Sequence, residues 1–224
     1  MRIQPKAVLF DYGNVLARPQ SPADVEALAA ILDLPISTFT EMYWRFRVSY
    51  DAAEFDAATY WRTVANASTR ELVSAQIDRL VEIDGLSWCH PAPVMPQWAR
   101  DIRREGLRTA LLSNMPLTVR QAVERASWLP EFDVRTFSCD VGICKPAPEI
   151  YRRCLNDLGC EASEVLFLDD RPANVHGAEA VGMHALLFTS PEQAAAALEA
   201  RFNLPVPLAF AAKAAQIQPP DGVH

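Results

Sequence analysis

Acidic residues stand directly after apolar runs at two distant points of the chain. Asp11 follows the apolar run 7–10, and Asp169 with Asp170 follows the apolar run 165–168. A short apolar run that ends in a polar residue is typical of a buried parallel strand that delivers this residue to the carboxyl edge of its sheet. Ligands of open α/β sheets bind at that edge. The two runs therefore predict one site in which carboxylates from distant parts of the sequence meet.

A hydroxyl, an amide and an ammonium extend this predicted site. Ser113 and Asn114 follow the apolar run 110–112, where a hydroxyl and the N–H groups of a helix start can bind phosphate oxygens. Lys145 lies in a proline-flanked loop, from which its ammonium can neutralise a phosphate and a nucleophile together. Each segment alone has a simpler interpretation, because Ser and Asn are common helix caps and most lysines are solvated. Together with the carboxylates they predict a metal-assisted site for a phosphorylated substrate.

The residue types specify the chemistry. Asp11 can act as a carboxylate nucleophile that attacks phosphorus and forms an acyl-phosphate, and a strand-ending turn with Gly13 is the structural alternative. Asp169 and Asp170 are costly to place together without a cation. Hard oxygen ligands without histidine suit Mg²⁺, and an exposed acidic turn is the alternative. Asn174 either holds this acidic pair through its side chain or caps the following helix.

The composition limits the class of protein. The 224 residues are 50% hydrophobic and 22% charged, as in an ordinary globular protein with a sizeable core. The net charge of −7 argues against a nucleic-acid or anionic-membrane partner. Five cysteines without a CxxC pair indicate neither a zinc site nor disulfides. The N-terminus lacks an apolar stretch of signal-peptide length, so we expect a soluble cytoplasmic protein.

Helix signals fill the stretch from about residue 21 to residue 86. Ser21 before Pro22 predicts a helix N-cap with proline at the first helical position. After the proline-rich segment 90–96, strand and helix signals alternate, which favours a doubly wound parallel sheet. The predicted strands cover 108–113, 134–137, 165–169 and 184–188 in addition to the first strand, and helices begin near 96, 117 and 148.

These patterns predict an α/β protein with an insertion. The expected division is a Rossmann-like core over residues 1–17 and 94–204, a helical cap over 18–93, and a C-terminal tail over 205–224. Basic and aromatic side chains of the cap are candidates for substrate contact because the cap is expected to face the core. These candidates are Arg45, Arg47, Tyr50, Tyr60 and Trp61, and a local basic pocket could also include Arg18 and Lys145.

With these motifs in order over residues 7–190, the chain resembles the haloacid dehalogenase superfamily of hydrolases. The motifs begin at Phe10, Leu112, Lys145 and Phe167. More narrowly, they are similar to the motifs of the bacterial α-D-glucose-1-phosphate phosphatase branch, and they also resemble the phosphatase domain of soluble epoxide hydrolases. The resemblance implies a Rossmann-like core with an α-helical cap inserted after the first strand.

The resemblance also implies roles for individual residues. Asp11 would be the nucleophile, and Lys145 would support both Asp11 and the substrate phosphate. Ser113 with Asn114 would hold the transferring phosphoryl group. Mg²⁺ would be bound by Asp11, the main-chain carbonyl of Gly13, and Asp170, with Asp169 helping through water. The expected partner is a small phosphorylated molecule such as a hexose 1-phosphate, and both a monomer and a homodimer stay open.

One position departs from the usual motif of this superfamily. A second aspartate usually stands two residues after the nucleophile, where it protonates the leaving group and then activates water, but this chain has Gly13. General acid–base catalysis contributes about 10²–10⁴-fold. Three outcomes are open: a slow phosphatase, a substrate whose leaving group needs little protonation, or a lost activity. The sugar-phosphate phosphatases also have Gly at this point, and a C1-phosphate of a sugar has a leaving group more acidic than an ordinary alcohol.

Two other classes of protein are compatible with most of these motifs. A 2-haloacid dehalogenase uses the first aspartate and lacks the second, but it attacks carbon without a metal. Asp169 and Asp170 argue against this class because the acidic pair would repel an anionic substrate in the absence of Mg²⁺. A catalytically impaired binding protein on the same scaffold would tolerate the loss of Asp11 or Lys145, yet both residues are present.

Overall fold

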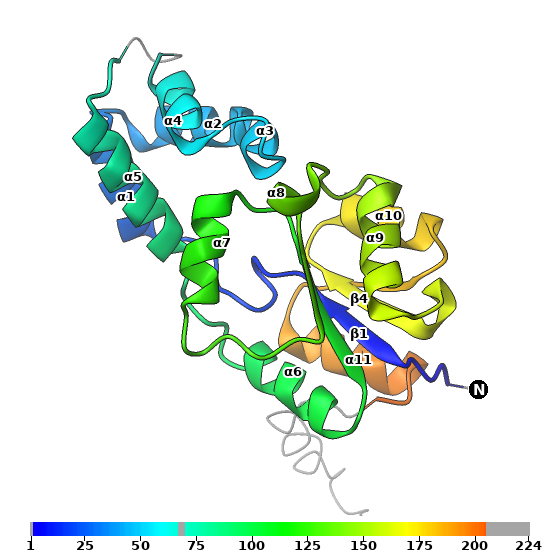
Figure 1. The fold of residues 1–224 in the computed structure, drawn as a ribbon. Helices are drawn as coiled ribbons and strands as arrows, with labels where there is room; N and C mark the ends of the chain where they lie inside the picture. The colour runs from blue at the N-terminus through cyan, green and yellow to red at the C-terminus, as the bar shows by residue number, and fades with distance from the viewer. Residues whose placement is uncertain (1, 67–69, 205–224) are drawn as a thin grey trace, which may run out of the picture.

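A five-stranded sheet forms the centre of the computed structural model, which describes residues 2–66 and 70–204. All its strand pairs are parallel, and the strand order is β3-β2-β1-β4-β5. The chain is therefore an α/β protein with a Rossmann-like sheet (Figure 1). The strands are β1 (Ala7–Phe10), β2 (Arg108–Ser113), β3 (Val134–Phe137), β4 (Val165–Asp169) and β5 (His184–Leu187).

Helices cover both faces of this sheet because the side chains of each strand alternate between two cores. Val8 and Phe10 of β1 pack in one core with side chains of the helices α6, α7 and α11. Ala7 and Leu9 pack in the other core with α9 and α10. The strands are buried on both sides, as expected for a doubly wound sheet. These helices are α6 (Met95–Arg104), α7 (Leu117–Glu124), α9 (Pro148–Leu158), α10 (Pro172–Ala180) and α11 (Pro191–Arg201).

Between β1 and α6 the described residues form five helices and their connections, in line with the helix signals from about residue 21 to residue 86. The helices are α1 (Pro22–Ile31), α2 (Ile36–Arg45), α3 (Arg47–Asp51), α4 (Ala57–Asn66) and α5 (Ser74–Ser87), and they lie apart from the sheet at the upper left of Figure 1. Ser21 caps α1 as predicted, with its side chain accepting a hydrogen bond from the Asp24 N–H. These helices share a hydrophobic core of their own.

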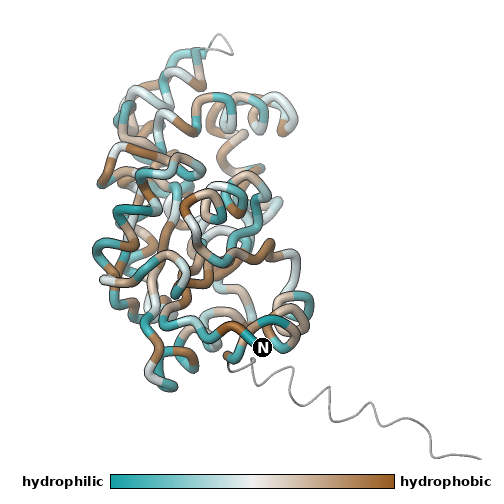
Figure 2. The backbone as a smooth tube through the Cα atoms, turned by 90° about the vertical axis from the view of Figure 1, so that its right-hand side faces the viewer, coloured by the Kyte–Doolittle hydropathy of each residue, from teal (hydrophilic) through white to brown (hydrophobic). Residues whose placement is uncertain are grey.

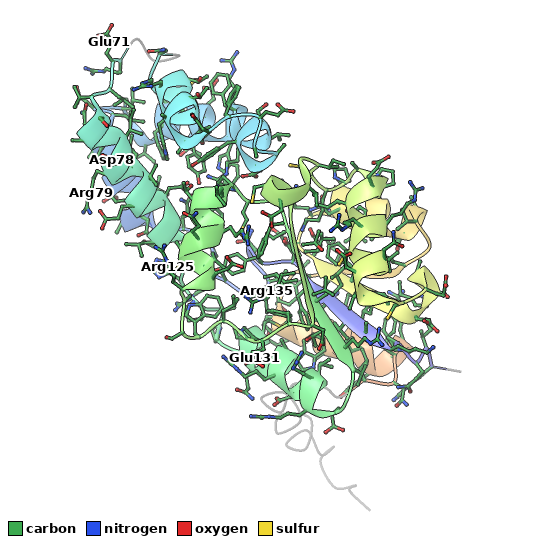
Figure 3. The ribbon with its side chains drawn as sticks, in the orientation of Figure 1. Glu71, Asp78, Arg79, Arg125, Glu131 and Arg135 are labelled. Carbon is green, nitrogen blue, oxygen red and sulfur yellow. The ribbon has the colours of Figure 1, made fainter. Side chains whose placement is uncertain are left out.

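Polar and apolar faces of the cap helices follow the sequence. Ile77 and Leu80 of α5 are buried in the core of the cap. Asp78 and Arg79 on the same helix are exposed and lie on its outer side (Figure 3). This division is the amphipathic pattern of a helix that packs on one face only. Hydrophilic and hydrophobic residues are interspersed along the backbone (Figure 2). No helix in the described part of the chain is long and apolar enough to cross a membrane.

Two connections join the cap to the sheet side by side. The Arg18 N–H donates to the His90 carbonyl at 2.7 Å, and the Ala92 N–H donates to the Leu16 carbonyl at 2.9 Å. The chain therefore leaves the core and returns to it at one place. On this basis we propose 18–93 as the extent of the cap and 1–17 with 94–204 as the core. The predicted tail, 205–224, lies outside the described residues.

Two short elements complete the core. The helix α8 (Ser138–Val141) follows β3, and the 3-10 helix η1 (Ala162–Glu164) precedes β4. The cap helix α3 contacts α8 beyond the carboxyl ends of the strands (Figure 1). The helix α9 begins at Pro148, near the predicted start, and is followed by Gly159, which adopts a left-handed conformation with φ of 62°. The cap thus reaches over the sheet edge where the sequence predicts the site.

Candidate active site

Lys145 joins the two carboxylate segments of the sequence. Its ammonium nitrogen Nζ lies 2.7 Å from Asp11 Oδ1 and 2.7 Å from Asp169 Oδ2. The same ammonium donates a hydrogen bond to the Leu112 carbonyl at 2.9 Å. Lys145 is only 5% exposed and Asp169 is fully buried. The structure therefore brings Asp11, Lys145 and Asp169 into one buried ionic group.

The strand order explains why these residues meet. β1 lies between β2 and β4, with Phe10 in register with Leu168. The Asp11 N–H continues the ladder by donating to the Leu168 carbonyl at 2.9 Å. Asp11 and Asp169 are therefore neighbours at the carboxyl edge of the sheet, as the apolar runs predict.

A third carboxylate lies beside this pair. Single carboxylate oxygens of Asp11, Asp169 and Asp170 all lie within 4.8 Å of one another. Asn14 donates from its side-chain amide to Asp170 Oδ2 at 2.7 Å. This contact holds the Asp170 side chain toward the loop that follows β1.

Asn174 contacts Asp169 through its side-chain amide. Of the two interpretations of Asn174, this contact favours a role in holding an acidic residue over a role as helix cap. The side-chain nitrogen of Asn174 lies 3.0 Å from each oxygen of Asp169. The Arg171 N–H also donates to Asp169 Oδ1 at 2.8 Å. Both Asp169 oxygens thus have protein partners, which suits a carboxylate that positions Lys145.

The ionic balance of the group is unfavourable without a further cation. Burial raises the pKa of Asp11 to about 7, although the Lys145 ammonium opposes this shift. Burial also disfavours the charged form of Lys145, but Asp11 and Asp169 outweigh this effect and raise its pKa. One ammonium therefore faces three carboxylates when Asp170 is included.

Ser113 and Asn114 occupy the same edge but have different surroundings. Ser113 is 3% exposed, and its hydroxyl has no hydrogen-bond partner among residues 2–66 and 70–204. The Asn114 side chain donates to the Lys145 carbonyl at 3.0 Å and accepts from the Lys145 N–H at 2.8 Å. Asn114 therefore fixes the Lys145 loop, and its backbone N–H is the group left for the predicted phosphate contact.

A cavity of about 100 Å³ opens at this edge between the core and the cap. Asp11, Gly13, Ser113, Lys145 and Asp170 line it, as the sequence predicts for one site. Of the candidate cap residues, Arg47 also lines it. Tyr50, Tyr60 and Trp61 are buried in the core of the cap, Arg45 is exposed, and Arg18 contacts the Pro91 carbonyl. The local basic pocket predicted from Arg18, Arg45, Arg47 and Lys145 is therefore wrong for the first two residues.

Eight lining residues are absent from the prediction, namely Tyr12, Asn14, Trp44, Asp51, Trp88, Met115, Val119 and Arg171. Trp88 stands against Gly13, because a Cβ added at Gly13 would lie 3.4 Å from Cζ3 of the indole. The signal available for Asp51 is its i, i+4 spacing from Arg47, which is typical of a helical ion pair. This spacing does not reveal which helix face meets the core.

Comparison with known families adds the chemical class. The sequence model of the haloacid dehalogenase-like hydrolases matches residues 5–182. The chain belongs to this family. The membership confirms the resemblance of the motifs and the Rossmann-like architecture.

Relatives in this hydrolase family include phosphatases. The chain is 28% identical over 186 residues to Phosphatase MT3486 of Mycobacterium tuberculosis, covering 81% of this chain and 86% of the relative. It is 40% identical over 120 residues to mouse Acyl-CoA dehydrogenase family member 10, covering 52% of this chain but 11% of that longer protein. The phosphatase relatives indicate a hydrolase that acts on phosphate esters.

Solved structures with this fold include a family enzyme with bound magnesium and phosphate and a dehalogenase. A haloacid dehalogenase family enzyme from Bacteroides thetaiotaomicron, in complex with magnesium and inorganic phosphate, has a TM-score of 0.62 at 20% identity and covers 84% of this chain and 94% of that one. L-2-haloacid dehalogenase from Xanthobacter autotrophicus has a TM-score of 0.66 at 20% identity. It covers 90% of this chain, and the match includes 85% of that chain. Both likenesses concern the fold alone.

The carboxylate group of this hydrolase fits a hard divalent cation. Asp11 and Asp170 offer oxygen ligands on the cavity side, and no histidine lines the cavity in the described part of the chain. Three carboxylates beside one ammonium leave negative charge that a divalent ion neutralises. Few hard oxygen ligands with space for water suit Mg²⁺. Gly13 lines the same cavity, which makes its carbonyl a further candidate ligand.

Proposed function

We propose that this protein is a Mg²⁺-dependent phosphatase that hydrolyses a small phosphorylated metabolite through an aspartyl-phosphate on Asp11. The observation that carries the proposal is the Lys145 ammonium, which lies 2.7 Å from both Asp11 and Asp169 beside the cavity. An ammonium in this position favours the ionised form of the nucleophile and stabilises charge on an incoming phosphate. Phosphatase relatives in the same family support the same conclusion.

The chain's own residues account for two in-line displacements. Asp11 attacks phosphorus, and the bond from phosphorus to the leaving oxygen breaks. Lys145 and the hydroxyl of Ser113 stabilise the phosphoryl oxygens in this step. Water then attacks the aspartyl-phosphate, which releases phosphate and restores the Asp11 carboxylate. Mg²⁺, held by Asp11 and Asp170 with the Gly13 carbonyl and with Asp169 acting through water, would supply charge neutralisation that lets two anions approach.

A sugar phosphate such as a hexose 1-phosphate is the substrate that we propose. The hemiacetal oxygen of a C1-phosphate leaves more easily than an alkoxide, which lowers the demand for protonation at a site with Gly13. The cavity also presents the indoles of Trp44 and Trp88, whose ring centroids are 6.3 Å apart. Apolar faces next to polar groups suit a sugar ring. The small cavity supports a small leaving group.

The test is a panel of sugar, nucleotide and small organic phosphates, assayed with Mg²⁺ for phosphate release. We expect turnover of at least one class, with loss of turnover in excess EDTA. Asp11→Asn should abolish turnover while the thermal unfolding midpoint changes little. Asp78→Asn, an exposed acid on the outer side of α5, is the matched control and should keep full activity.

Two further assays separate the other two classes. Chloride release from a 2-haloacid in excess EDTA would identify a metal-independent dehalogenase. The close approach of Asp170 to Asp11 and Asp169 argues against that activity because three carboxylates repel an anionic substrate. Binding of a phosphate ester without turnover by wild-type protein would instead identify a binding protein.

A further inference from the structure

The cavity contains a carboxylate that the reaction above does not use. Of the acids that line it in the described part of the chain, Asp11 and Asp170 belong to the acidic group at the sheet edge, and Asp51 comes from α3 of the cap. Asp51 is 8% exposed. The core side of the cavity has no acid at residue 13, where Trp88 packs against Gly13. Asp51 is therefore the carboxylate to consider for proton transfer to and from the leaving group.

Hydrogen bonds fix the backbone at Asp51 to the core, close to the segment that follows Ser113. The Asp51 carbonyl accepts from the Ser138 hydroxyl at 2.6 Å, and this hydroxyl accepts from the Met115 N–H at 3.0 Å. Met115 is two residues from Ser113. The neighbouring Tyr50 hydroxyl lies 2.6 Å from the Thr118 hydroxyl of α7. Two separate contacts thus hold this part of α3, and Asp51 with it, against the core.

The partners of Asp51 leave one of its oxygens free. Arg47 Nε lies 2.8 Å from Asp51 Oδ1, whereas Oδ2 has no hydrogen-bond partner among the described residues. Arg47 is shared with the fully buried Asp84, whose Oδ2 lies 3.3 Å from its guanidinium. Asp84 also accepts from the Tyr43 hydroxyl at 2.6 Å. One guanidinium therefore pairs with two carboxylates, and Asp84 has an additional hydrogen bond from the Tyr43 hydroxyl.

This arrangement favours a proton on Asp51. Burial raises its pKa, Arg47 lowers it, and the charge of Asp84 raises it again, so the net pKa of Asp51 lies above the usual range. The other charged or titratable groups that face it belong to the loop after β4, to the loop and helix after β3, and to α3 and α4. They are Arg171, Cys139, Cys144, Tyr50 and Tyr60.

We propose that Asp51 is the general acid and base of this active site, supplied by the cap in place of an acid at residue 13; the proposal rests on the phosphatase function. In the first step the proton of the Asp51 carboxyl passes to the leaving oxygen as its bond to phosphorus breaks and the bond from Asp11 to phosphorus forms. In the second step the Asp51 carboxylate takes a proton from the water that attacks phosphorus, and Asp11 is released. Asp51 returns to its protonated form.

The test compares two leaving groups in Asp51→Asn, which keeps the size of the side chain and an acceptor for Arg47. A simple alkyl phosphate needs a proton on its leaving oxygen, whereas 4-nitrophenyl phosphate does not. We expect Asp51→Asn to lower alkyl phosphate turnover by at least about 10²-fold. With 4-nitrophenyl phosphate it should give a burst of nitrophenolate followed by slow turnover, because the second step still lacks its base. Intact-protein mass after acid quenching should show accumulated phosphoenzyme.

Asp78→Asn is the control, because it removes an exposed carboxylate on the outer side of the cap helix α5. It should keep the wild-type ratio between the two substrates. Equal losses on both substrates in Asp51→Asn, with no accumulated phosphoenzyme, would overturn the role of Asp51 and leave the phosphatase function standing. Absence of turnover of either substrate by wild-type protein would instead overturn the phosphatase function. Thermal unfolding of both variants separates either result from loss of the fold.

Discussion

Gly177 on α10 lies directly against Pro146, the residue after Lys145. A Cβ added at Gly177 would lie 2.8 Å from the Pro146 carbonyl oxygen and 3.0 Å from the Tyr151 hydroxyl. No side chain fits at these distances without movement of the backbone. The Lys145 loop is thus held on one side by Asn114 and on the other by a helix that can approach closely because residue 177 is glycine.

Gly177→Ala should therefore act on the active site from outside it. We expect a loss of about 1–3 kcal/mol in the free energy of unfolding from overpacking. Turnover should also fall, because the loop that carries Lys145 must shift. Urea unfolding and phosphatase assays on the same preparation measure both effects. Unchanged stability together with unchanged turnover would show that α10 does not position the loop.

Lys145→Met removes the ammonium between Asp11 and Asp169. Breaking a buried ion pair by removing one partner costs about 3–5 kcal/mol, so the metal-free variant should lose roughly this much free energy of unfolding. Lys6→Met is the matched control, because Lys6 pairs with Glu164 at the surface with its side chain 69% exposed, and it should have little effect. Mg²⁺ should recover part of the loss in Lys145→Met. A loss no larger than that of Lys6→Met would contradict the buried ionic group.

Two accounts of the missing second aspartate make opposite predictions for Gly13→Asp. If Asp51 supplies the proton, Gly13→Asp alone should change alkyl phosphate turnover by much less than the roughly 10²-fold minimum typical of general acid–base catalysis. In the Asp51→Asn background it should restore part of the lost turnover. If the site only accepts leaving groups that need little protonation, Gly13→Asp alone should greatly raise alkyl phosphate turnover and leave hexose 1-phosphate turnover unchanged or lower. Steady-state kinetics on the three variants distinguishes these outcomes.

The cysteines near the cap should react slowly with alkylating reagents. Burial raises the pKa of the Cys144 thiol to about 11 and that of Cys139 to about 12. Only the thiolate reacts, and a free thiol has a pKa of about 8.5. Both residues should therefore stay protonated at neutral pH, with alkylation rates that rise only as the pH approaches these raised values. Peptide mapping after iodoacetamide treatment over a pH series measures this. Fast modification of Cys144 near neutral pH would show that the thiol is not held as described.

The sheet edge of this fold can be predicted from the sequence because its signals are local. Four apolar residues before Asp11 and four before Asp169 indicate buried strands, and the structure confirms β1 and β4 at these places. Parallel strands bring their carboxyl ends to one edge, so Asp11 and Asp169 must meet there once the strands are adjacent. The cluster of Asp11, Lys145 and Asp169 follows from this rule together with the proline-flanked loop.

The cap side of the cavity cannot be predicted in the same way. Asp51 enters it because Ser138 and Thr118 hold α3 against the core, and these contacts join residues far apart in the sequence. The helix α3 has only five residues, so no apolar periodicity indicates which face meets the core. The aromatic pattern also does not distinguish Trp44, which lines the cavity, from Tyr60, which is buried in the core of the cap, because an aromatic side chain suits both surroundings.

The most direct measurement for the central claim is the chemical state of Asp11 during turnover. Wild-type protein should be mixed with Mg²⁺ and the best phosphate ester from the panel, quenched in acid, digested and analysed by mass spectrometry. We predict one phosphoryl group on the peptide that contains Asp11, removed by hydroxylamine, and none in Asp11→Asn. Steady turnover of the ester with an unmodified Asp11 peptide, or with the phosphoryl group on another residue, would contradict the account.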